Sequence, residues 1–211
     1  MSARLTVAVL ISGRGSNMSA LLEAAAAPDY PARIALVATD RPGAAGLAAA
    51  SGAGVETLAL DARALGRPAF EAALDAGLRA RGVELICLAG FMRILSAAFV
   101  ERWRGRALNI HPSLLPAYKG LDTHARALAD GVAEHGCTVH WVTPELDSGE
   151  IIAQARVPVR PGDDPSSLAA RVLEQEHALY PRALAEVARA FNSQAAASAS
   201  PDNAGPTARS T

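Results

Sequence analysis

An asparagine and a histidine two positions apart give the first indication of chemistry in this chain. Asn109 and His111 end an apolar run, and Pro112 follows them. Because side chains alternate along a strand, the two would share one face at the strand's carboxyl end. An amide can donate a hydrogen bond to a developing oxyanion, and an imidazole can move protons near neutral pH, so the pair suits acyl transfer. A hydrogen-bonded structural histidine is the alternative.

An acidic turn at residues 143–150 holds a carboxylate that could complete such a site. Asp147 lies there between two strand-like segments. If it lies near His111, its negative charge would favour the charged imidazolium. The local sequence does not bring the two together, so a solvated surface turn is the default interpretation.

A glycine-rich junction near the start of the chain suggests an anion-binding loop. Residues 12–17, Ser-Gly-Arg-Gly-Ser-Asn, separate an apolar run from a helix-like segment. Backbone N–H groups at the start of a helix bind anions, and the helix dipole assists them. The junction lacks the Gly-Lys-Ser/Thr of a P-loop, and Met18 replaces the third glycine of a dinucleotide fingerprint. A single phosphate fits better than a pyrophosphate; a plain turn capped by Ser16 is the alternative.

The elements that must position these residues alternate in type. Apolar strand-like runs followed by helix-like segments are typical of a parallel sheet with helices on both faces. We predict strands at 5–11, 34–39, 55–60, 83–89 and 107–111, and helices at 18–26, 44–50, 68–81 and 123–129. Segments 138–142 and 151–159 predict a hairpin, which adds antiparallel strands on the C-terminal side. The expected fold class is α/β, with a mostly parallel, twisted, Rossmann-like sheet.

We expect one domain over residues 1–191, made of two merged halves. Residues 1–105 would form a Rossmann-like, phosphate-binding half, and residues 106–191 a catalytic and folate-binding half. A closing helix that begins near residues 163–165 and is interrupted at Pro181 would end the domain. Residues 192–211 lack periodicity and predict a disordered, low-complexity tail.

Composition excludes several classes of function. The net charge is −1 and only 4% of residues are aromatic, which disfavours a nucleic-acid surface. No apolar run approaches the roughly 20 residues that span a bilayer, and the first strand starts at Leu5, so we expect a cytoplasmic protein without membrane contact. The spacing of His124, His135, His140 and Cys137 matches no common metal site, and no metal is expected.

Four motifs in series resemble the folate-dependent phosphoribosylglycinamide formyltransferases. They occupy residues 9–17, 88–96, 108–116 and 135–140, the last leading to 146–149. The resemblance spans about residues 5–190. It implies transfer of a formyl group from the co-substrate 10-formyltetrahydrofolate to the amine of 5'-phosphoribosylglycinamide in purine synthesis, by a monomer or a homodimer. Methionyl-tRNA formyltransferase adds a C-terminal β-barrel and formyltetrahydrofolate deformylase an N-terminal regulatory domain, and we expect neither here.

The resemblance also implies roles for single residues. The catalytic set would be Asn109, His111 and Asp147, with Asn109 and a protonated His111 stabilising the oxyanion. The ribose phosphate would bind at Gly15, Ser16 and Asn17, and the acceptor's amine or ribose at Glu176. The folate would bind at Arg67, Met92, Arg93, Ile94, Leu95 and Asn109. Asp122 replaces a histidine of the bacterial pattern and Leu173 a polar residue, so these two receive no role.

A dinucleotide-binding domain, redox or non-catalytic, is the rival interpretation. It would use Asp40, at the end of the second strand, to contact a ribose hydroxyl.

Overall fold

The structure, a computed structural model, describes residues 4–199 and contains one seven-stranded sheet. The strand order is β3-β2-β1-β4-β5-β6-β7. The first five strands pair in parallel, and β6 and β7 add antiparallel pairs at one edge. The predicted α/β class with a C-terminal antiparallel addition is therefore confirmed. The strands are β1 (Leu5–Ile11), β2 (Ala32–Thr39), β3 (Glu56–Ala59), β4 (Leu85–Leu88), β5 (Ala107–His111), β6 (Glu134–Trp141) and β7 (Ile151–Pro158).

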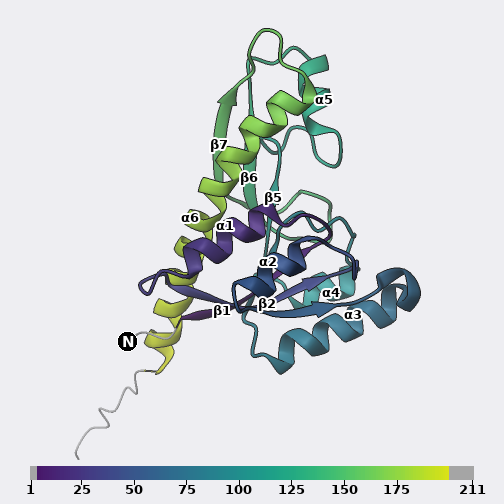
Figure 1. The fold of residues 1–211 in the computed structure, drawn as a ribbon. Helices are drawn as coiled ribbons and strands as arrows, with labels where there is room; N and C mark the ends of the chain where they lie inside the picture. Colours follow the sequence, from purple (N-terminus) through teal and green to yellow (C-terminus); the bar gives the residue numbers. More distant parts are fainter. Residues whose placement is uncertain (1–3, 200–211) are drawn as a thin grey trace, which may run out of the picture.

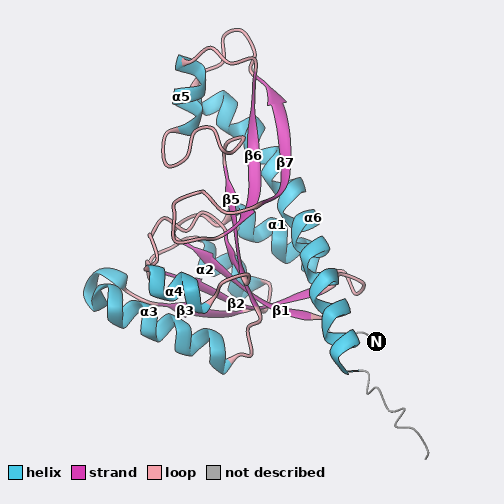
Figure 2. Cartoon of the chain, turned by 180° about the vertical axis from the view of Figure 1, so that it is seen from behind, coloured by secondary structure: helices cyan, strands magenta, loops and turns pink. Residues whose placement is uncertain are grey.

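Helices cover both faces of this sheet (Figures 1 and 2). Because β1 is covered on both sides, all its residues are apolar or buried, and their alternation creates two cores. Val7 and Val9 join one core with α1 and α6, whereas Ala8 and Leu10 join another with α3 and α4. The helices are α1 (Ser16–Ala25), α2 (Gly46–Gly52), α3 (Ala62–Ala80), α4 (Ala97–Arg102), α5 (Thr123–Ala129) and α6 (Pro165–Ala199).

No helix within residues 4–199 combines the length and the apolar composition needed to cross a membrane.

Two helices, α3 and α4, depart most from the prediction. α3 begins at Ala62 because Asp61 accepts hydrogen bonds from the backbone of Arg63 and Ala64, and the helix is kinked at Gly66. α4 is absent from the prediction. It is one short segment whose first turn is capped by Ser96, and a helix of this length carries too little periodicity to be recognised.

The closing helix α6 corrects two predictions. It continues without interruption past Pro181 and reaches Ala199, so a tail that starts at Asn192 is wrong for residues 192–199. Packing explains the difference, because Leu184 and Ala188 are buried in the core and the Asn192 side chain donates to the Pro31 carbonyl at 3.0 Å. The alanine-rich end also has a high helix propensity. Residues 200–211 of the predicted tail lie outside the described residues.

Candidate active site

A cavity of about 620 Å³ opens beyond the carboxyl ends of β4 and β5. This is where ligands bind in open α/β sheets, and the volume suits a small molecule. Asn109 and His111 line it from the end of β5, as predicted. Distant segments contribute the other predicted groups that line the cavity, which are Asn17, Glu176, Asp147 and the four residues 92–95.

Asn109 is held by a histidine that the sequence did not assign to the site. In the β5–β6 ladder Asn109 pairs with His140, and its Nδ2 lies 3.1 Å from His140 Nε2. His140 Nδ1 lies 2.9 Å from the Trp141 carbonyl, which can only accept, so Nδ1 carries the proton and Nε2 accepts from the amide. Burial lowers the pKa of His140, which favours this neutral ring. Asn109 keeps one N–H for a ligand.

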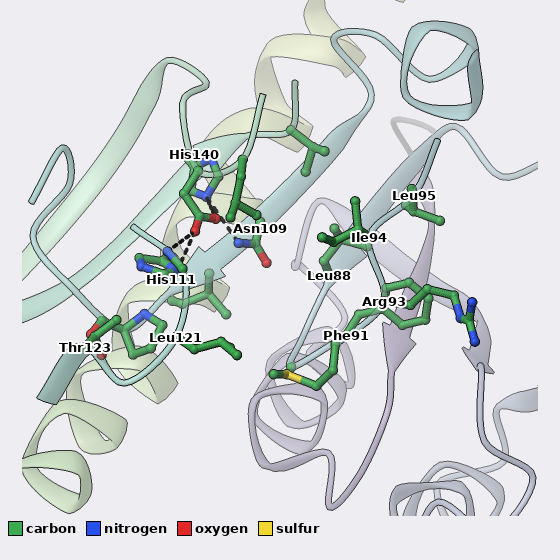
Figure 3. A pocket seen from close by; sticks show the side chains of 18 of the residues that line it. Leu88, Phe91, Arg93, Ile94, Leu95, Asn109, His111, Leu121, Thr123 and His140 are labelled. Atoms are coloured by element: carbon green, nitrogen blue, oxygen red, sulfur yellow. Dashed lines mark hydrogen bonds and ion pairs between the residues drawn. The ribbon is translucent and has the colours of Figure 1, made fainter. Parts of the chain in front are cut away.

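His111 lies beside Asp147, so the solvated-turn interpretation of residues 143–150 is wrong for this carboxylate. His111 Nδ1 is 3.4 Å from Asp147 Oδ2, and the Asp147 side chain is only 8% exposed. The Gly120 backbone N–H donates to the same oxygen at 2.9 Å and fixes it (Figure 3 shows the dashed contacts at His111). His111 Nε2 lies 2.9 Å from the Tyr118 carbonyl.

Both ring nitrogens of His111 thus face oxygen atoms that can accept a hydrogen bond. A hydrogen bond from the ring to a ligand would require that Asp147 or Tyr118 be displaced.

The two loops that surround His111 and Asp147 contain strained backbone conformations. Three non-glycine residues in the described chain have a left-handed φ, namely Tyr118 at 55°, Asp122 at 57° and Asp147 at 46°. Such conformations are costly and persist where surrounding contacts fix them, most often at functional sites. Tyr118 supplies the carbonyl that holds His111, and the other two residues line the cavity.

The start of α1 has the properties of an anion site. Gly15 is its N-cap with φ 75°, so the predicted alternative of a Ser16 cap is not formed. The N–H groups of residues 16–18 meet no acceptor in the described chain. Asn17 donates to Glu176 Oε2 at 2.7 Å, and both line the cavity. Burial raises the pKa of Glu176, and the bond from Asn17 opposes this rise.

An apolar wall faces the Asn109–His111 pair across the cavity (Figure 3). Met92 and Ile94 are 58% and 64% exposed, and Leu121 and Leu146 on the opposing loops are also exposed. Exposed apolar side chains that gather around one cavity mark a ligand surface. Arg67 is not part of it. It is exposed on α3 outside the cavity lining, so its assignment to the folate stays a prediction.

Comparison with known proteins identifies the family. The family model described as formyl transferase matches residues 5–184. The chain belongs to the formyl transferase family. This confirms the resemblance that the four sequence motifs indicate. Membership in this family implies a folate-derived formyl donor and small-molecule substrates.

Individual formyl transferases are similar over most of the chain. A phosphoribosylglycinamide formyltransferase of Escherichia coli (strain K12) is 47% identical over 178 residues, which cover 84% of each protein. The crystal structure of a phosphoribosylglycinamide formyltransferase from Brucella melitensis has 50% identity and a TM-score of 0.84, with 88% of this chain and 96% of that chain covered. The trifunctional purine biosynthetic protein adenosine-3 of Drosophila melanogaster is 50% identical over 185 residues, 86% of this chain but 14% of that protein. The chain therefore spans a small part of this relative.

Another histidine of this formyl transferase should make its stability depend on pH. His135 is fully buried, and within the described chain neither ring nitrogen has a hydrogen bond of good geometry, although the Pro112 backbone lies close enough to oppose the lowering of the pKa. Burial, followed by repulsion from His124, lowers the pKa of His135 from 6.5 to about 4. Because the unfolded chain then binds the proton more tightly, stability is fully present above pH 6.5 and is lost as the pH falls toward 4.

We expect the free energy of unfolding to decrease by up to about 3 kcal/mol over that pH range through His135 alone. Urea denaturation at pH 7, 5.5 and 4.5 measures it. In His135→Asn, which cannot be charged, the decrease should be smaller by this amount. An identical decrease in both proteins would contradict the expectation.

Within residues 4–199, no group of three or more His, Cys, Asp or Glu side chains is arranged to hold a metal ion.

Proposed function

We propose that the chain transfers the formyl group of 10-formyltetrahydrofolate to the amine of 5'-phosphoribosylglycinamide, a step of purine biosynthesis. One observation carries the proposal. A single cavity is lined by Asn17 in the first turn of α1, by the Asn109–His111–Asp147 group and by an exposed apolar wall at residues 92–95. These three parts suit a phosphate, an acyl transfer and a flat apolar ring system. The names of the similar bacterial proteins support the same substrates.

The two substrates would enter from opposite sides of the cavity. The acceptor's phosphate would bind the N–H groups at Gly15, Ser16 and Asn17, and its amine or ribose would contact Glu176. The pterin would lie against residues 92–95 and reach Asn109, while the exposed Arg67 would meet a carboxylate of the glutamyl end outside the cavity. Residues 1–105 would thus supply the phosphate site and the apolar wall, and residues 106–191 the reacting groups.

The reaction follows from this placement. The acceptor amine attacks the formyl carbon, and the carbonyl oxygen becomes an oxyanion that the free N–H of Asn109 and the charge of His111 stabilise. The bond between the formyl carbon and the donor nitrogen then breaks, and the proton lost by the amine passes to that nitrogen. The products are the N-formyl acceptor and tetrahydrofolate. Such an enzyme would act in the cytoplasm as a monomer or homodimer.

A comparison of acceptors tests the proposal. The purified protein is given 10-formyltetrahydrofolate with phosphoribosylglycinamide, with methionyl-tRNA, or with water alone, and the formyl products are quantified by mass spectrometry. We expect formylation of phosphoribosylglycinamide to be far faster than either other reaction. Equal rates of hydrolysis and transfer would overturn the assignment.

The phosphate loop gives a prediction about acceptor affinity. In Gly15→Val, the new Cβ would lie 3.1 Å from Met18 Cε and 3.2 Å from Gly46 Cα, at a φ of 75° that side chains rarely adopt. We expect the acceptor KM to rise about tenfold or more, because relief of about 1–2 kcal/mol of left-handed strain at this position would move the N–H groups that are proposed to bind the phosphate. Donor KM should stay near that of the wild type.

Gly54→Val is the matched control. Gly54 has φ 74°, a Cβ at this position would meet nothing within 4 Å, and the residue lies in the turn before β3. The substitution should destabilise the fold without changing either KM. If Gly15→Val raises the donor KM and leaves the acceptor KM unchanged, the assignment of the two binding sites to donor and acceptor is reversed.

A further inference from the structure

The apolar wall at residues 90–95 is an irregular segment that needs external support. It contains neither helix nor strand, and Gly90 has a φ of 71°. Met92 and Ile94 nevertheless project their apolar side chains outward. Without a backbone ladder, such a segment would relax so as to bury these side chains against the protein. Its conformation must therefore be fixed by bonds from neighbouring elements.

Asp40 fixes the start of the segment through Ser12. The Ser12 backbone N–H donates to the Gly90 carbonyl at 3.2 Å, and the Met92 N–H donates to Ser12 Oγ at 2.8 Å. Ser12 Oγ donates its own proton to Asp40 Oδ1 at 2.5 Å. A hydroxyl has one proton, so giving it to the buried carboxylate turns a lone pair toward the Met92 N–H.

The second carboxylate oxygen of Asp40 orients Arg93, which lies between Met92 and Ile94 in the sequence. Arg93 Nε lies 3.8 Å from Asp40 Oδ2, and its guanidinium lies over the Phe70 ring at 5.4 Å. Arg41 faces the same oxygen at 3.9 Å. Figure 3 shows the Arg93 side chain directed away from Asn109 and His111. With Arg93 held on this side, Met92 and Ile94 are left to face the cavity.

Glu71 fixes the other end of the segment. It is buried on α3, and its Oε1 accepts from the Ser96 backbone N–H at 2.6 Å. Its Oε2 accepts from the Ser96 hydroxyl, and that hydroxyl in turn accepts from the Phe99 N–H and caps α4. Hydrogen bonds to charged acceptors are about twice as strong as neutral ones, so the Glu71 carboxylate holds this end of the segment firmly.

We infer that Asp40 and Glu71 are positioning residues that shape the donor-binding wall at residues 90–95. Neither lines the cavity, so they act through Ser12 and Ser96. The inference rests on the proposed function for the identity of the donor. It also gives Asp40 a role different from the ribose contact of a dinucleotide-binding domain, because its carboxylate is turned inward onto Ser12 and Arg93.

Two isosteric variants test the inference. Asp40→Asn keeps an acceptor for Ser12 and removes the charge that faces Arg93, and Glu71→Gln removes one of two acceptors for Ser96. We expect each to raise the donor KM about tenfold, the size of one weakened charged hydrogen bond, with kcat and acceptor KM changed less than about twofold. Calorimetry with 5-formyltetrahydrofolate, a stable isomer of the proposed donor, should show the same loss of affinity.

Asp75→Asn is the matched control. Asp75 is a largely buried carboxylate on the same helix as Glu71, but it binds Trp103 Nε1 and Arg79 and does not touch residues 90–95. It should lower stability and leave the donor KM unchanged. An equal rise in donor KM in all three variants, or none in Asp40→Asn and Glu71→Gln, would overturn the inference.

Other outcomes separate the inference from the proposed function. If the wild-type protein does not formylate phosphoribosylglycinamide, the proposed function fails, and the calorimetry still measures whether the two carboxylates support folate binding. If wild-type affinity for 5-formyltetrahydrofolate is absent as well, both are wrong. Should Asp40→Asn not fold, Ser12→Ala removes the hydroxyl that links Asp40 to Met92 and carries the same expectation.

Discussion

Replacement of Asn109 by alanine is expected to lower kcat by about 10²- to 10³-fold, the usual loss when one oxyanion donor is removed. The Asn109 amide is fixed by His140 at 3.1 Å, and its second N–H is free to face the cavity. A donor fixed in advance acts most strongly on charge that develops in the transition state, so both KM values should change little. Steady-state kinetics with each substrate varied in turn measure the separation.

Gln154→Ala is the control for Asn109→Ala. Gln154 Nε2 donates to the Leu115 carbonyl and to Thr138 Oγ1, both at 2.9 Å, and lies outside the cavity lining. Its loss should affect stability rather than kcat. A comparable fall in kcat in both variants would mean that the loss of any amide near β6 disturbs the site. Asn109 would then have no specific role as an oxyanion donor.

His111→Ala should reduce kcat at least as much as Asn109→Ala. If the two groups stabilise one oxyanion, the double variant should lose less than the product of the single losses. Strictly multiplicative losses would show that they act on different steps. The comparison is informative because the two ring nitrogens of His111 already face Tyr118 and Asp147, so its charge rather than a direct bond would reach the oxyanion.

Local sequence is sufficient to place Asn109 and His111. Strand alternation puts both on one face, and Pro112 ends the strand, so their position at the edge of the sheet follows from a few consecutive residues. Their partners cannot be found in this way. Asp147 reaches His111 only because the loop after β6 folds back over the carboxyl end of β5, and a turn sequence alone does not specify that long-range contact.

The contact of His140 with Asn109 could not be predicted from the sequence for a related reason. The predicted strand that carries it begins at residue 138, whereas β6 begins at Glu134 and pairs with β5 in antiparallel register. The register that places His140 beside Asn109 requires knowing which strands are neighbours. The continuation of α6 past Pro181 likewise depends on burial against the sheet, which outweighs the local preference of proline to end a helix.

Asp147→Asn should reduce kcat by about 10²-fold, through loss of charge rather than of shape. The asparagine oxygen can still accept from the Gly120 N–H, so the loop should keep its place. What disappears is the negative charge 3.4 Å from His111 Nδ1, which stabilises a charged ring. Both KM values should stay within a few-fold of wild type.

The pH dependence of the variant separates His111 from His140, which also faces Asp147 at 3.7 Å. Burial lowers the pKa of His140, and the charge of Asp147 partly opposes this. Its removal should therefore lower that pKa further, and His140 stays the neutral acceptor of the Asn109 amide at neutral and alkaline pH. A loss of activity in Asp147→Asn at neutral or alkaline pH therefore does not arise from a change in the protonation of His140.

Asp130→Asn is the control, because Asp130 is a carboxylate in the same region that binds the Tyr118 hydroxyl at 2.9 Å and does not line the cavity. It should keep nearly full activity across the pH range. If Asp147→Asn also turns over at nearly the wild-type rate, the close approach to His111 is structural and the charge of Asp147 has no part in formyl transfer. A large loss in Asp147→Asn alone would instead tie turnover to the carboxylate that the fold places against His111.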